Sequence, residues 1–198
     1  MTLNRAAATW HRVIPNQVAA VIGFGTILKV LEEKQLRRVF LGEHILLLFE
    51  NELLIRYQIQ EMLRVEKTYE EEGIQAELEA YNPLVSGGSN LKATMQIEYV
   101  DEVERARMLV KLKGIERRVW MSVAGFDPVF AIADEDMSRE NDEKTAAVHF
   151  LRFAFSAPMI AALKDGKSLA VGVDHEHYHA AIGGLAEPVR LSLVADLK

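Results

Sequence analysis

The order of strand-like and helix-like segments constrains the fold of this chain more than any single motif does. Short segments that are apolar or alternate between apolar and polar residues predict strands, and they are interspersed irregularly with helical patterns. Regular alternation would predict parallel βαβ units, whereas an irregular order favours antiparallel pairing with helices packed on the sheet. We therefore predict an α+β fold with a mainly antiparallel sheet and several helices packed on it.

The individual elements follow from the local period of the pattern. Three short antiparallel strands are predicted within residues 36–58, with Leu53–Tyr57 as the third. Further strands are expected over residues 91–100, 117–124, 129–133, 145–155 and 168–175, the last continuing to about residue 181. Helices are expected over residues 59–67, 74–81, 101–113 and 156–164, and the residues after Pro188 fit either a helix or a strand.

The composition is that of one globular domain. The chain has 198 residues, of which 49% are hydrophobic and 26% charged, and no linker-like break divides it. We predict a single domain over residues 1–198, with a helical N-terminal segment (1–36) and a core (37–198). The net charge of −6 gives no electrostatic reason to expect nucleic acid as a partner, because nucleic-acid binding relies on clustered cations.

A membrane location is not expected either. The most apolar stretch, Val18–Leu31, is shorter than the roughly 20 residues that span a bilayer and contains Lys29. The N-terminus lacks the pattern of a secretory signal, so we expect a cytoplasmic protein. The sequence does not indicate the oligomeric state, and a homo-oligomer is compatible with it.

The chain contains no cysteine, which restricts the chemistry open to it. Disulfides, thiolate catalysis and an iron–sulfur cluster ligated by this chain are therefore excluded. The sequence also lacks the glycine-rich nucleotide-binding motifs, HExxH and GxSxG. A divalent metal bound by histidine and carboxylate side chains is the cofactor that the residues leave open.

His149 and Arg152 interrupt the apolar strand predicted over residues 145–155. Side chains alternate along a strand, so the two residues should lie on opposite faces. Both faces are otherwise apolar, which predicts a central strand covered on both sides. A buried donor without a partner costs about 1–3 kcal/mol. Arg152 therefore indicates a buried ion pair or an anion site, and His149 indicates a hydrogen-bonded core histidine or a metal ligand or acid–base group.

The segment GVDHEHYH (172–179) is the second place where polar residues enter an apolar strand. If the strand continues, His175, His177 and His179 share one face with neighbours roughly 7 Å apart, and Asp174 lies on the other face. Two imidazoles at that spacing can bind one zinc ion. The alternative is a polar loop that has left the sheet.

The helix predicted over residues 59–67 carries three further candidates. Glu61 and Arg64 have the spacing of an i, i+3 ion pair. Glu66 recurs with the apolar residues Ile59 and Met62. It is therefore either a charge at the helix edge or a partner for a buried cation or metal.

Several segments together resemble the bacterial domain-of-unknown-function family DUF3501. They are LGEHILLLFEN, YQIQEMLRVEK, EEGIQAELEAYNPL, IEYVDEVERARMLVKLKGIERRVW, AIADEDMSRENDEKTAAVHFLRF and GVDHEHY. The resemblance begins at about Arg37 and implies a soluble bacterial protein of one domain. Family genes are associated with genes for rubrerythrin-like and iron–sulfur oxidoreductases, which implies a redox or peroxide-stress setting and a redox partner protein.

The sequence departs from the family pattern in two places. The stretch IPNQVAAVIGFGTIL (14–28) is less polar than the usual family opening. The family typically has proline at the position of Glu176 and does not keep His177 or His179, so Asp174, His175 and Tyr178 are the residues that match. A proline there also favours a turn.

Three functions remain open from the sequence. The favoured one is a non-catalytic accessory or binding protein that acts on a redox partner. The second is a metal-dependent or acid–base enzyme using His149, His175 and a carboxylate, with the two histidines as metal ligands. The third is a binder of a small anionic ligand through Arg152 and Arg64. The candidate pocket comprises His149, Arg152, Asp174, His175, Tyr178, Glu61, Arg64 and Glu66.

Overall fold

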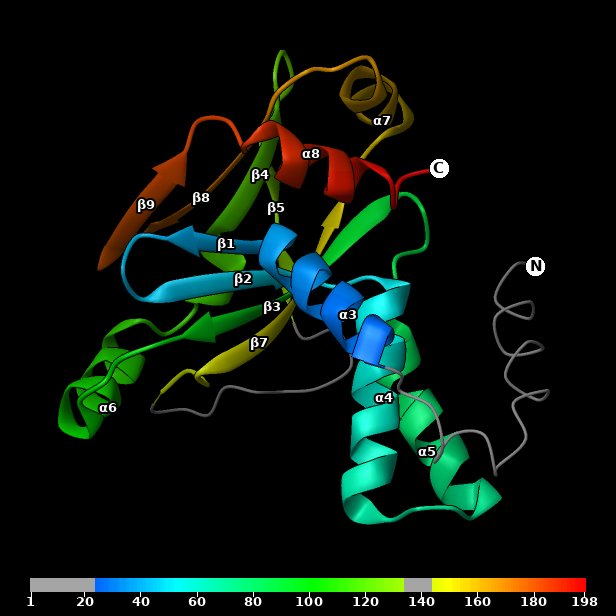
Figure 1. The fold of residues 1–198 in the computed structure, drawn as a ribbon. Coiled ribbons are helices and arrows are strands. Elements are labelled where there is room, and N and C mark those ends of the chain that lie inside the picture. The colour runs from blue at the N-terminus through cyan, green and yellow to red at the C-terminus, as the bar shows by residue number, and fades with distance from the viewer. Residues whose placement is uncertain (1–23, 134–143) are drawn as a thin grey trace.

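The computed structural model describes residues 24–133 and 144–198, and Figure 1 shows their arrangement. The helices are α3 (Phe24–Leu36), α4 (Glu52–Glu66), α5 (Glu71–Tyr81), α6 (Glu102–Lys111), α7 (Ala157–Lys164) and α8 (Glu187–Val194), with 3₁₀ turns η1 (Asn82–Leu84) and η2 (Ile115–Arg118). The strands are β1 (Arg38–Leu41), β2 (Ile45–Phe49), β3 (Asn90–Ile97), β4 (Val119–Val123), β5 (Val129–Phe130), β6 (Ile132–Ala133), β7 (Val148–Ala154), β8 (Leu169–His175) and β9 (Tyr178–Ile182). None of the helices within these residues is both long and apolar enough to cross a membrane.

The strands form two antiparallel sheets that share one hydrophobic core. Sheet A has the order β1-β2-β3-β7-β6, and sheet B has the order β5-β4-β8-β9. Alternate residues of both sheets face inward, so that Leu47 and Met95 of sheet A belong to the same buried cluster as Met121 and Val171 of sheet B. The predicted α+β class with antiparallel pairing is confirmed, although the strands are divided between two sheets.

Residues 129–133 pass directly from sheet B to sheet A. The strand predicted over residues 129–133 is split into β5, which pairs with β4 of sheet B, and β6, which pairs with β7 of sheet A. Between them, the Ala131 amide donates a hydrogen bond to the Val119 carbonyl over 2.8 Å. One extended segment therefore closes this edge of the core.

The predicted third strand, Leu53–Tyr57, is wrong because these residues begin helix α4. Asn51 is the N-cap, and its side chain accepts a hydrogen bond from the Leu54 amide over 2.9 Å. Leu54, Ile55, Ile59 and Leu63 are then buried at helical spacing. The cap and the longer periodic run together outweigh the local resemblance to a strand.

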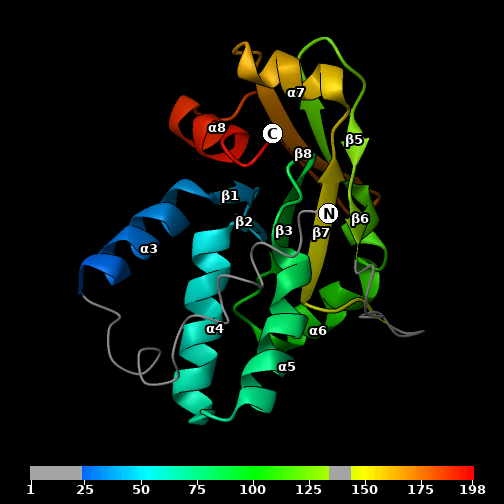
Figure 2. The same cartoon turned by 90° about the vertical axis from the view of Figure 1, so that its right-hand side faces the viewer.

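Helices α4 and α5 form an antiparallel hairpin, here called the helical arm (residues 52–81). Ile55, Ile59 and Leu63 of α4 pack with Leu78 of α5 in a small cluster separate from the main core. Figures 1 and 2 show the arm extending away from the sheets, with the α4–α5 turn at its far end. The arm thus presents its own surface, supported by its own small core.

The C-terminal half of helix α3 faces the outward side of sheet A, and its N-terminal end points away from the sheets (Figure 2). A cavity of about 250 Å³ separates them, lined by Leu31, Lys34, Gln35, Arg38, Leu46, Leu48, Gln96 and Glu98. The predicted helical N-terminal segment is helical over Phe24–Leu36, and its residues 1–23 lie outside the described residues. Residues 134–143, between β6 and β7, also lie outside the described residues.

Arg37, at the junction of α3 and β1, is buried and connects three distant parts of the chain. Its guanidinium contacts Glu33 at 2.7 Å and both carboxylate oxygens of Asp196, at 2.7 and 3.1 Å. It also donates to the carbonyl oxygens of Glu50 and Ser192. Arg37 therefore holds α3 against the strand that precedes α4 and against the C-terminal segment after α8.

Candidate functional site

Strand β7 places His149 in the main core, where it belongs to a buried polar cluster with Glu116 and Thr145. All three residues are at most 1% exposed. Along β7 the burial alternates, so Arg152 lies on the opposite face and is half-buried. Strand β7 pairs with β3 along its length and with the two-residue strand β6 on its other side. The alternation of faces follows the prediction for this strand.

The polar cluster is connected by short contacts. The His149 Nε2 atom lies 2.7 Å from Thr145 Oγ1 and 3.0 Å from the Ala146 carbonyl oxygen. The Thr145 hydroxyl donates to Glu116 Oε2 over 3.3 Å, and that oxygen is 3.9 Å from His149 Nε2. A carbonyl can only accept, so Nε2 carries a proton in this arrangement. The cluster is enclosed by the core and is therefore closed to a substrate.

His175 ends strand β8, and both of its ring nitrogens are engaged. Nε2 donates to the Lys113 carbonyl oxygen over 3.1 Å, which leaves Nδ1 to accept from the His177 amide over 3.2 Å. These two bonds fix the tautomer and leave no lone pair for a metal ion. In the residues that the structure describes, no group of three or more histidine, aspartate or glutamate side chains could hold a metal ion.

The predicted continuous strand through His179 is wrong because the chain reverses at Glu176 and His177. Strand β8 ends at His175, and β9 begins at Tyr178 and pairs with β8. His175, His177 and His179 therefore do not share one strand face. Asp174 and His179 are cross-strand partners, with His179 Nε2 2.9 Å from Asp174 Oδ1, and Arg118 contacts the other carboxylate oxygen at 3.2 Å.

Tyr178 links sheet B to the turn between β1 and β2 of sheet A. Its hydroxyl donates to the Leu41 carbonyl over 2.6 Å and accepts from the His44 amide over 3.1 Å. Gly42 in this turn has φ +68°, and a Cβ there would lie 2.5 Å from the Tyr178 hydroxyl oxygen. The His44 ring stacks on Tyr99 at 3.9 Å, and burial raises the pKa of Tyr99. Tyr178 thus has a structural role in this position.

Replacing Tyr178 with phenylalanine should lower the free energy of unfolding by about 1–3 kcal/mol, because it leaves the Leu41 carbonyl and the His44 amide without this partner. Urea denaturation measures the change. The matched control is Tyr81→Phe, since no described residue forms a hydrogen bond with the Tyr81 hydroxyl, and the expected change there is below about 0.5 kcal/mol. Equal losses in the two variants would refute the link between the sheets.

Glu61, Arg64 and Glu66 lie on the helical arm, apart from the histidines. Glu61 and Arg64 form the predicted ion pair at 2.7 Å, and this hydrogen bond lowers the pKa of Glu61. Glu66 is exposed at the end of α4. The predicted residues therefore fall in three places: the buried polar cluster and β7, the β8–β9 turn, and the arm.

The short connection between α6 and β4 contacts both His149 and His175. The Lys113 carbonyl accepts from His175, and Glu116 in η2 contacts the cluster around His149. Sequence reasoning missed Glu116 because a single 3₁₀ turn has no apolar period that would mark a buried carboxylate. Its Oε1 atom is buried without a hydrogen-bond partner in the described residues and lies 3.6 Å from Arg117 Nε.

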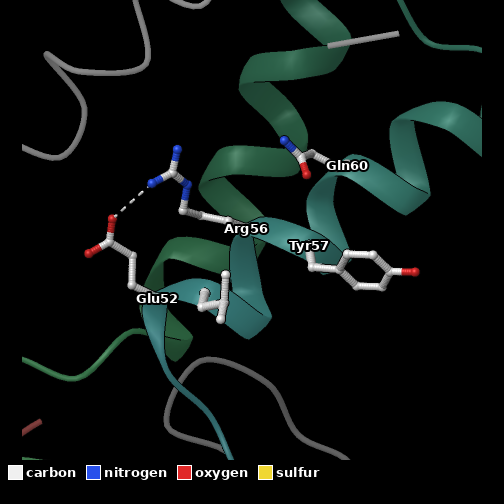
Figure 3. A pocket seen from close by; sticks show the side chains of 5 residues that line it. Glu52, Arg56, Tyr57 and Gln60 are labelled. Atoms are coloured by element: carbon white, nitrogen blue, oxygen red, sulfur yellow. Dashed lines mark ion pairs between the residues drawn. The ribbon is translucent and has the colours of Figure 1, made fainter. Parts of the chain in front are cut away.

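The outer face of α4 borders an open pocket of about 470 Å³. Its described lining consists of Glu52, Leu53, Arg56, Tyr57 and Gln60. Figure 3 shows the ion pair between Arg56 and Glu52, 3.6 Å apart, with Tyr57 and Gln60 on the same helix. Lys34 of α3 lies 5.6 Å from the centre of the Tyr57 ring. The pocket combines apolar surface with a positive and a negative side chain. The sequence did not indicate it, because a strand was predicted over Leu53–Tyr57.

These features define a two-sheet α+β protein with a closed polar cluster and a projecting helical arm. The family described as "Protein of unknown function (DUF3501)" matches residues 25–197, so the chain belongs to that family. The resemblance noted in the sequence is confirmed, and the match begins before Arg37, inside the stretch that departs from the usual family opening.

A solved structure supports the fold over the whole chain. The chain is similar to a novel protein of unknown function from Burkholderia pseudomallei K96243, known from a crystal structure, with 47% sequence identity and a TM-score of 0.83. The similarity covers 100% of this chain and 96% of that one. A comparison with curated proteins found no match.

Proposed function

We propose that this chain is a non-catalytic accessory or binding protein that acts on a partner protein in a bacterial redox or oxidative-stress system. The observation that carries the proposal is the open pocket on α4, which offers Leu53 and Tyr57 beside the Arg56–Glu52 ion pair. Apolar and aromatic surface with a few polar groups is typical of recognition sites. The redox setting rests on the family resemblance and not on the geometry.

The arrangement of the histidines supports binding over catalysis. A general acid or base must reach a substrate within hydrogen-bond distance. His149 and its partners Glu116 and Thr145 are enclosed by the core, and both nitrogens of His175 are bonded to the backbone. The anion-binding alternative has less support, because Arg64 is paired with Glu61 on the arm whereas Arg152 lies on β7.

The test is affinity purification of the full chain from the organism that encodes it, using the wild type and Leu53→Asp. Leu53 is 37% exposed, so a charge there should disturb the pocket and spare the fold. The matched control is Leu191→Asp on α8, where the leucine is 54% exposed. We expect a redox protein to be recovered with the wild type and the control and to be lost with Leu53→Asp. Recovery of no protein above background, or equal recovery with all three chains, would contradict the proposal.

A further inference from the structure

The net charge of the chain is concentrated on the helical arm. Residues 61–79 contain seven glutamates against Arg64 and Lys67, which gives −5 of the total charge of −6. The remaining sequence is nearly balanced, with 22 acidic and 21 basic residues. A local excess of one sign creates a field that steers oppositely charged partners to that surface.

Two apolar side chains lie at the end of the arm among these charges. Val65, in the last turn of α4, is 64% exposed, and Tyr69, in the connection to α5, is 56% exposed. Neither belongs to the small cluster that holds the arm together. An exposed aromatic residue with charged neighbours is the composition of an interaction hot spot, because tyrosine brings large contact area at low entropic cost.

The turn that carries Tyr69 is well defined. Lys67 has φ 54°, in the left-handed region, and its amide donates to the Leu63 carbonyl. The Thr68 amide donates to the same carbonyl over 3.0 Å. A Cβ on Gly73 would overlap Thr68 Cγ2, so the threonine packs directly over the first turn of α5. These contacts shape the turn from within the arm, and a preformed surface lowers the entropic cost of association.

The glutamates around Tyr69 are available for a partner. In residues 24–133 and 144–198, no ion pair involves Glu66, Glu70, Glu71 or Glu72. Four neighbouring carboxylates repel one another unless a cationic surface compensates them. Glu61, in contrast, is already paired with Arg64.

We infer that the arm tip (Val65, Glu66, Tyr69, Glu70, Glu71 and Glu72) is a docking surface for a protein that presents basic side chains around an apolar contact for Tyr69. This inference rests on the proposed function and specifies the chemistry of the partner. The negative charge disfavours nucleic acid and anionic lipid, and it also disfavours a second copy, whose tip carries the same charge. Tyr69 provides the buried contact, and the glutamates set orientation and association rate.

The test is photo-cross-linking in the organism that encodes the chain, with p-benzoylphenylalanine in place of Tyr69 in the full chain. The control carries the same residue in place of Phe130, which is 46% exposed on sheet B. Charge reversal by Glu70→Lys, Glu71→Lys and Glu72→Lys is compared with Glu43→Lys, Glu102→Lys and Glu176→Lys, which changes the net charge equally at other exposed positions. In cleared extract, cross-linking is repeated at about 50 mM and about 300 mM salt, because screening weakens exposed charge pairs.

We expect one cross-linked protein with a basic surface at position 69 and none at position 130. The tip reversal should lower its yield by about tenfold, higher salt should lower it as well, and the control reversal should leave it within about twofold. The inference would be overturned if position 69 gave no product, or if the product were an acidic protein, a nucleic acid, a lipid or a second copy of this chain. A yield that does not change with the tip reversal would overturn it as well. The proposed function can be judged separately in that case. If affinity purification recovers a partner with the wild type and loses it with Leu53→Asp, the proposed function stands and the tip inference alone fails.

Discussion

Replacing Arg37 with methionine should lower the free energy of unfolding by about 3–5 kcal/mol, the range found when one partner of a buried ion pair is removed. The guanidinium satisfies Asp196 through two short contacts and also bonds to Glu33 and two carbonyl oxygens. Methionine matches much of the apolar volume but leaves Asp196 without its cation. The loss should therefore exceed that from a change in packing.

Chemical denaturation monitored by circular dichroism measures this difference. The control is Arg118→Met, because Arg118 also forms an ion pair, with Asp174, but at the surface. Exposed ion pairs contribute about 0–1 kcal/mol, so the control should change stability by no more than that. A loss below about 1 kcal/mol for Arg37→Met would show that the buried network does not stabilise the fold.

The second large effect is expected in the helical arm. Ile59 is 2% exposed at the centre of the small α4–α5 cluster, and truncating a buried isoleucine to alanine costs about 2–5 kcal/mol. Because this cluster is separate from the main core, Ile59→Ala should promote local opening of the arm. Amide hydrogen exchange in α4 and α5 should accelerate by roughly 30-fold or more, since 1.4 kcal/mol corresponds to a factor of ten.

Hydrogen exchange measured by mass spectrometry resolves the two regions. The matched control is Ile97→Ala on β3, where the isoleucine is 3% exposed in the main core. The control should accelerate exchange in the sheets, whereas Ile59→Ala should leave sheet B protected. Parallel acceleration in the arm and the sheets for both variants would mean that the chain unfolds as one unit.

The sequence predicts the elements whose signals are local. Asp101 and Glu104 have the spacing of an N-cap and its partner, and Asp101 accepts a hydrogen bond from the Glu104 amide at the start of α6. After the end of this helix, Gly114 has φ +82°, which glycine adopts readily. The period of apolar residues locates β2, β3 and α5. Leu53–Tyr57 fails because five apolar-rich residues fit either a strand or a helix until the Asn51 cap decides.

Long-range contacts were not predictable in the same way. Nothing in the local pattern assigns β5 to sheet B and β6 to sheet A, because their partners are determined by the closure of the core. Glu116 and Arg37 are also invisible to the pattern, since their burial depends on partners distant in sequence, such as Thr145 and Asp196. The histidines were found because polar residues stand out in apolar strands, but their partners were not.

The contact between Arg37 and Asp196 has a consequence for the biosynthesis of this chain. The two residues are 159 positions apart, and synthesis proceeds at about 5–20 residues per second. Asp196 is therefore incorporated about 8–30 s after Arg37, and the ion pair between them cannot form before then. During that interval the nascent chain can pair β1 with β2, but α3 lacks the ion pair to Asp196 that attaches it to the C-terminal segment.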